Sequence, residues 1–176
     1  MSVPSVAVVS YRTAVDLIGQ RERDELVAVR QAFSGALDGR ALLIFPQTNS
    51  FELTRAVLGV DASSEQVAAM EDEALTETGN IILNGCVGTM ANMLSQTLEM
   101  SLPEVVRGTG DDVFASASAE DNRDYVLFFF INFVVQERNI RGYIALLMDV
   151  PSLAALKMLL EKFIADVMDE IPAPPL

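Results

Sequence analysis

Four polar side chains in the segment 63–98 have the types and the spacing to do chemistry together. Glu73, Glu77, Asn80 and Asn84 are separated by four, three and four residues, so on an α-helix they form one stripe. A carboxylate on such a stripe can meet a cation, and an amide can hold a water molecule. A polar stripe is often only the wet side of an amphipathic helix, although asparagine is a poor choice for a helix interior. The spacing therefore leaves both interpretations open.

The segment that carries the stripe is predicted to be one long helix over 63–98. Gly79, Gly85 and Gly88 lie inside it, and each costs a helix about 1 kcal/mol relative to alanine. Three glycines therefore indicate either close packing against another element or a break in the helix. Gly79 would also let a second backbone or a bulky phosphorylated side chain approach the stripe. The apolar residues predicted to turn to other faces are Ile81, Ile82, Cys86, Met90 and Leu94.

The composition narrows the chemistry that the chain can perform. Its 176 residues are 51% hydrophobic and 21% charged, with one cysteine and no histidine. This excludes an internal disulfide, Cys-based zinc sites and every nucleophile pair that needs histidine. The acidic residues near Glu71 lack the spacing of a calcium loop, so we predict no metal site. Any catalysis must use carboxylates, amides, hydroxyls or lysines.

Charge and hydropathy narrow the range of partners and location. The formal net charge of −13 disfavours nucleic acid and anionic membrane surfaces as partners. The most apolar stretch, 125–135, is far shorter than the roughly 20 residues that a spanning helix needs. Because no signal peptide is visible either, the expected location is the cytoplasm.

The two ends of the sequence repeat one another at an offset of about one hundred residues. The first copy is predicted to have strands over 3–10, 24–33 and 41–45, then a helix over 50–58 capped by Ser50. The second copy has strands over 103–106, 125–136 and 143–148, then a helix over 152–163, with a loop over 108–112. An internal duplication of strand, strand, strand and helix predicts an α+β fold.

The copies are expected to form one domain over 1–176, with repeats of about 3–60 and 103–168 joined by the helical segment 63–99. A long helix precedes only the second copy, because the first copy follows directly on Met1 and Ser2. The pattern predicts that an equivalent first helix is absent. Apolar surface left by its absence could be covered by a partner or by a second copy of the chain, as in a homodimer.

Glu77, Gly79, Asn80 and Ile81, followed after 22 intervening residues by Pro103, resemble the motif of the active-site helix in the CheC/CheX family. That family dephosphorylates the response regulators of chemotaxis. The predicted repeats also resemble the duplicated fold of the family, and the resemblance covers nearly the whole chain.

The resemblance implies a phosphatase that acts on the aspartyl phosphate of a receiver domain. Glu77 would dock on the receiver's lysine, and Asn80 would orient a water for in-line attack on phosphorus. Glu73, Asn84 and Pro103 are the expected partner contacts. Mg²⁺ would be bound by the receiver, and this chain would carry no cofactor. Phosphoryl transfer asks mainly for positioning and electrostatics, which suits a chain without histidine.

Two features differ from the family pattern. Glu73 stands where the family usually has aspartate or serine, and the first long helix, which often carries a second copy of the motif, is not predicted. A non-catalytic reading therefore stays open. Flagellar switch proteins of the FliM and FliY type share the fold as interaction modules, and such a module would bind a receiver without hydrolysing its phosphate.

Overall fold

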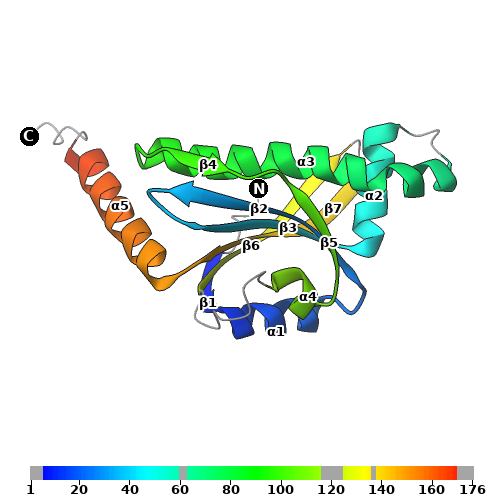
Figure 1. Cartoon of the computed structure of the whole chain (residues 1–176), viewed down its shortest axis with the longest axis horizontal. Coiled ribbons are helices and arrows are strands. Elements are labelled where there is room, and N and C mark those ends of the chain that lie inside the picture. Colours follow the sequence, from blue (N-terminus) through cyan, green and yellow to red (C-terminus); the bar gives the residue numbers. More distant parts are fainter. Residues whose placement is uncertain (1–5, 60–62, 116–124, 136–137, 170–176) are drawn as a thin grey trace, which may run out of the picture.

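The computed structural model describes residues 6–59, 63–115, 125–135 and 138–169, and an antiparallel sheet lies at its centre (Figure 1). The strands are β1 (Val6–Ser10), β2 (Leu26–Gly35), β3 (Gly39–Pro46), β4 (Leu98–Met100), β5 (Glu104–Gly108), β6 (Tyr125–Val135) and β7 (Arg138–Met148). The helices are α1 (Tyr11–Arg21), α2 (Gln47–Leu58), α3 (Ser64–Met93), α4 (Gly110–Phe114) and α5 (Val150–Asp169). The predicted α+β class is confirmed.

The two copies exchange their first strands. The sheet order is β1-β6-β7-β3-β2, with β4 and β5 both pairing with β2 at the far edge. The first strand of each copy thus pairs with the second strand of the other, β1 with β6 and β5 with β2. Neither copy builds its part of the sheet alone.

The predicted order within each copy was wrong in one respect, because a helix follows the first strand in both. In the first copy Ser10 caps α1 by accepting a hydrogen bond from the Thr13 backbone N–H at 3.2 Å. In the second copy the segment predicted as a loop forms α4, whose capping box joins Thr109 and Asp112. The helix α4 has only five residues, too few to show a helical period. The helix α1 does show one, because Tyr11, Ala14 and Ile18 recur at helical spacing, and that signal was overlooked.

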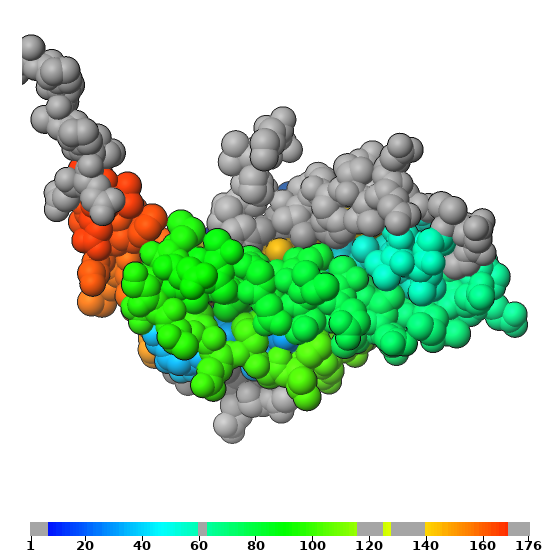
Figure 2. Space-filling model, turned by 90° about the horizontal axis from the view of Figure 1, so that it is seen from above, coloured from blue at the N-terminus to red at the C-terminus, as the bar shows by residue number. Residues whose placement is uncertain are grey.

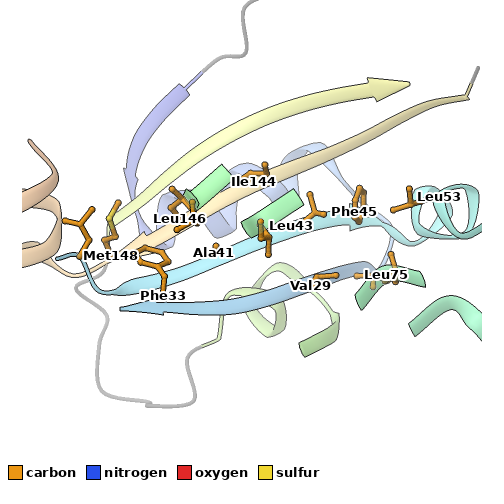
Figure 3. Close-up of a cluster of buried hydrophobic side chains, with 14 of the residues drawn as sticks. Val29, Phe33, Ala41, Leu43, Phe45, Leu53, Leu75, Ile144, Leu146 and Met148 are labelled. Carbon is orange, nitrogen blue, oxygen red and sulfur yellow. The ribbon is translucent and has the colours of Figure 1, made fainter. Parts of the chain in front are cut away.

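The two faces of the sheet carry separate cores. Successive residues of β3 point to opposite sides, so Leu43 and Phe45 pack in the core beneath α3, whereas Leu42 and Ile44 pack toward α1 and α4. Figure 1 shows α3 lying along one face, with α1 and α4 on the other. Figure 3 shows the first core, where labelled side chains of β2, β3 and β7 follow one another along the sheet and Leu75 of α3 lies beside Val29.

The long helix α3 is continuous from Ser64 to Met93 and ends earlier than predicted. Ser63 caps its start in a capping box, in which its hydroxyl accepts from the Gln66 N–H at 3.2 Å and its own N–H donates to the Gln66 side chain at 2.8 Å. Such a cap contributes about 1 kcal/mol. At the other end Ser95 takes a left-handed conformation, with φ 52°, which turns the chain out of the helix and into β4.

Ser50 does not cap the second helix as predicted. The helix α2 begins three residues earlier, at Gln47. Ser50 is therefore inside the helix and fully buried, and its hydroxyl donates to a carboxylate oxygen of Glu71 at 2.6 Å.

The last helix, α5, extends to one side of the sheet (Figure 1). Leu156 is buried against the first core, while Met158 and Ile164 are exposed. Within the ranges that the structure describes, none of the helices is long and apolar enough to cross a membrane.

The only cysteine of the chain, Cys86, lies half-buried on α3 and packs against the first core. Burial raises the pKa of its thiol, so less of the reactive thiolate forms at a given pH. We expect the folded chain to react with a disulfide reagent at pH 8 several-fold more slowly than the chain in urea. The raised pKa of Cys86 also makes the stability of the fold depend on pH, because the folded chain keeps the thiol proton to higher pH than the unfolded chain does. This contribution to stability is complete below the unfolded pKa of about 8.5 and is lost as the pH rises through the folded pKa. Equal rates for the folded and unfolded chain would contradict this prediction, and Cys86→Ser provides the blank.

Candidate functional site

The predicted polar stripe lies on the outer face of α3. In Figure 2 this helix runs in green across the surface of the molecule. Glu73 and Glu77 are exposed, and within the described part of the chain neither carboxylate makes a hydrogen bond or ion pair. Asn80 and Asn84 are half-buried, because they turn from the solvent side toward the edge of the sheet.

The prediction for one neighbour of the stripe, Ile81, was wrong. Ile81 was predicted to turn to another face, yet 70% of its surface is exposed, one turn after Glu77. Leu102, in the loop between β4 and β5, is 89% exposed. The stripe is therefore accompanied by exposed apolar side chains, which suit a protein partner better than a small ion.

The amide of Asn80 is held by two neighbouring amides. Gln31 Nε2 donates to Asn80 Oδ1 at 3.1 Å, and Asn84 Nδ2 donates to the same oxygen at 2.7 Å. Asn84 lies one turn further along α3, whereas Gln31 comes from β2 beneath the helix. Asn84, a predicted partner contact, thus holds the Asn80 side chain in place within the chain itself.

Pro103 follows a loop that is tied to the same strand. The Ser101 carbonyl accepts from Gln31 Nε2 at 2.9 Å. Ser101 also exchanges hydrogen bonds with Ala32, through its N–H at 2.8 Å and its hydroxyl at 2.9 Å. Proline restricts the residue before it to extended conformations, so Pro103 limits the conformations open to Leu102 in this loop. The distant proline of the motif and Asn80 are thereby linked through Gln31.

Sequence reasoning missed Gln31. On β2, the residues facing α3 are Val27, Val29, Gln31 and Phe33, and Gln31 is 1% exposed. A polar residue at an inward position of a predicted strand was the available signal, since buried polar groups must find partners. Its Nε2 finds two, but its Oε1 is buried and has no donor among the described residues. A buried acceptor without a partner costs about 1–3 kcal/mol.

Gly79 brings α3 close to β2 at this point. It is buried, and a β-carbon added there would lie 2.5–2.7 Å from side-chain atoms of Val29. Of the two predicted reasons for the glycines, close packing is therefore correct for Gly79 and a break in the helix is wrong. Because Gly79 faces the core, a phosphorylated side chain could not approach it there. At Gly85 and Gly88 such a β-carbon would meet no atom of the described residues within 4 Å.

The acidic residues just before the stripe, Glu71 and Asp72, make contacts within the chain. Glu71 is 6% exposed and accepts hydrogen bonds from Ser50, from Gln47 at 3.1 Å and from Arg107 at 3.1 Å. Arg107 also pairs with Asp72. These contacts join α3 to α2 and β5, and a buried carboxylate needs such partners. Among the described residues no group of three acidic or cysteine side chains could hold a metal ion.

The arrangement offers positioning chemistry. An exposed carboxylate can pair with a cation on a partner. One turn later, a fixed amide can hold a small polar group such as water or a phosphoryl oxygen. No cysteine or serine nucleophile accompanies them in the stripe, so the reacting bond must be supplied by a partner.

The sequence matches the family model described as chemotaxis phosphatase CheX over residues 27–129, more than half of the chain. This range contains Gln31, Glu77, Asn80 and Pro103. A protein of Halobacterium salinarum, provisionally named CheY-P phosphatase CheC1, is 21% identical over 119 residues. That alignment covers 67% of this chain and 61% of the relative, so the chain matches less than two thirds of its length.

Solved structures show the same fold. FliY of Thermotoga maritima superposes with a TM-score of 0.63 at 15% identity, covering 93% of this chain and 81% of that one. CheX of Desulfovibrio desulfuricans superposes with a TM-score of 0.54 at 16% identity, covering 84% and 83%. At these identities the likeness shows the fold alone. Together with the family match, which includes the amide cluster and the exposed glutamate, it places this chain in the CheX family of chemotaxis phosphatases.

Proposed function

We propose that this chain accelerates hydrolysis of the aspartyl phosphate on a receiver domain of the CheY type. The observation that carries the proposal is the combination of two side chains on α3. The exposed carboxylate of Glu77 makes no hydrogen bond or ion pair with the described residues, and one turn later Gln31 and Asn84 hold the Asn80 amide. Membership of the CheX family and the name of the H. salinarum relative support it.

In the proposed reaction the receiver supplies both the phosphoryl group and a bound Mg²⁺. The oxygen of a water attacks phosphorus in line with the leaving carboxylate, and the bond between phosphorus and the aspartate oxygen breaks. The products are inorganic phosphate and a free aspartate, and the proton of the water leaves with the phosphate or to solvent. Asn80 orients the water, so its contribution is positioning.

The exposed side chains around the Asn80 amide would bind the receiver domain. Glu77 would pair with the receiver's lysine. Ile81 and Leu102, which are largely exposed, would contribute apolar contact area. Glu73 and Pro103 remain proposed partner contacts at the margins of this surface.

The test is the rate of phosphate release from a phosphorylated CheY-type receiver, with and without this chain. Glu77→Gln is expected to raise the KM for the receiver about tenfold and to change kcat less, because close intermolecular charge pairs couple by about 1.5 kcal/mol or more. The increase should shrink in high salt. Glu73→Gln, four residues earlier on the same face, is the matched control and should have a smaller effect.

Two results would go against the proposal. If both variants behaved like the wild type, Glu77 would not be the docking carboxylate. If the chain bound the phosphorylated receiver without accelerating release, the non-catalytic interaction module would be the better description.

A further inference from the structure

The orientation of the Asn80 amide follows from one group whose identity is unambiguous. The Ser101 backbone carbonyl can only accept a hydrogen bond, so the Gln31 atom that lies 2.9 Å from it must be the amide nitrogen. That nitrogen also lies 3.1 Å from the side chain of Asn80. Since it is a donor, the Asn80 atom facing it must be the oxygen. The positions of oxygen and nitrogen in the Asn80 amide therefore follow from a backbone carbonyl, whose role as an acceptor is fixed.

The same reasoning extends outward to the surface. Asn80 Oδ1 accepts from Gln31 below it and from Asn84 beside it. Both donors to this oxygen therefore belong to the protein itself. Asn80 Nδ2 has no acceptor among the described residues, and the side chain is half-buried. The amide presents its NH₂ group to whatever binds at the surface.

The stability of the core does not explain why a glutamine, Gln31, occupies this position. It lies at an inward position among Val27, Val29 and Phe33, with its own Oε1 buried and without a donor in the described part of the chain. An apolar side chain of similar volume would fill this place without burying an unsatisfied acceptor. Departures of this kind are expected at functional sites.

We propose that Gln31 is a positioning residue for the reaction, acting through Asn80. It fixes the amide so that the NH₂ group donates to the attacking water, and the water keeps a lone pair free for phosphorus. Without Gln31 the remaining hydrogen bond from Asn84 does not fix the orientation, because the Asn84 amide can itself turn over and accept. The Asn80 amide can then rotate and present its oxygen instead. This inference rests on the proposed function and names the residue that orients its amide.

The test is Gln31→Met, which keeps the length of the side chain and removes both donated hydrogen bonds. We expect kcat for phosphate release from the phosphorylated receiver to fall 10- to 100-fold, as for a misplaced catalytic group. KM should stay unchanged because Glu77 is untouched and the loop that carries Leu102 keeps both hydrogen bonds between Ser101 and Ala32. The melting temperature should not fall. Gln47→Met is the matched control. Its Oε1 is also buried and meets no donor among the described residues, but its nitrogen binds Glu71 and not Asn80. The kcat of Gln47→Met should therefore be preserved.

A double-mutant cycle separates positioning from a general structural effect. In an Asn80→Ala background, Gln31→Met should cause no further loss of kcat. A similar loss in both backgrounds, or an unchanged kcat in the single variant, would overturn the proposal.

A spectroscopic measurement tests the contact without relying on activity. The side-chain amide resonances of Asn80 in ¹⁵N-labelled protein are identified by their loss in Asn80→Ala. Gln31→Met should displace them, and Gln47→Met should not. Unchanged Asn80 resonances in Gln31→Met would overturn the inference. If the wild-type chain did not accelerate phosphate release, the proposed function would fail and with it the catalytic role of Gln31. Displaced resonances would then still support the hydrogen bond to Asn80.

Discussion

Replacing Asn80 with alanine is expected to lower the acceleration of phosphate release by about 10²-fold or more, which is the usual cost of removing one preorganised hydrogen-bond donor. The physical reason is that Asn80 combines an amide held by Gln31 and Asn84 with an NH₂ group that meets no acceptor among the described residues. The measurement is kcat for phosphate release from a phosphorylated receiver at saturating concentrations of that receiver.

The loss should not come from unfolding. Alanine is a better helix former than asparagine in the interior of α3, and Gln31 keeps its hydrogen bond to the Ser101 carbonyl. Circular dichroism melting should therefore show little change. Asn80→Asp sharpens the test, because it keeps the shape and the acceptor oxygens but removes the NH₂ group and adds a negative charge. If Asn80→Asp retained full activity, donation from Asn80 would not be the means of catalysis.

Replacing Gly79 with alanine is expected to lower the free energy of unfolding by about 1–3 kcal/mol, the usual cost of overpacking a core. The added β-carbon would lie 2.5–2.7 Å from three side-chain atoms of Val29. Val29 is fully buried in the first core, so it cannot move aside easily and α3 must shift away from β2. Urea denaturation monitored by circular dichroism measures the change.

Gly85→Ala is the matched control on the same helix. A β-carbon there meets no atom of the described part of the chain within 4 Å, so the substitution should raise the free energy of unfolding by about 0.5–1 kcal/mol through helix propensity alone. Opposite signs for the two substitutions are the expected result. Stabilisation by both would mean that α3 is not seated on β2 as the structure has it.

Much of the fold was predictable because its signals are local. In β3 and in the second half of β7, residues 143–148, the chain is a run of apolar residues, and the long helix α3 opens with a capping serine, Ser63. The helix α4 was missed because five residues have little periodicity to read, whereas α1 was missed although Tyr11, Ala14 and Ile18 recur at helical spacing. The Ser50 cap was wrong because Ser50 bonds to Glu71, 21 residues away.

In the candidate site too, the residues that were predicted lie close together in the sequence, and the residue that was missed lies far from them. Glu77 and Asn80 were found because three-residue spacing on a helix places them on one side. Gln31 was missed, since it lies 49 residues from Asn80 in the sequence and 70 from Ser101. Nothing near Gln31 in the sequence indicates which helix will cover its strand.

Local patterning was thus enough to identify the repeats, the polar stripe and the exclusion of histidine chemistry, because each depends on residue type or on spacing within one element. The exchange of first strands between the copies, the burial of Gly79 and the outward direction of the Asn80 NH₂ group required the folded chain. Each of these depends on contacts between residues far apart in the sequence, such as β5 with β2. Such contacts are set by how whole elements pack.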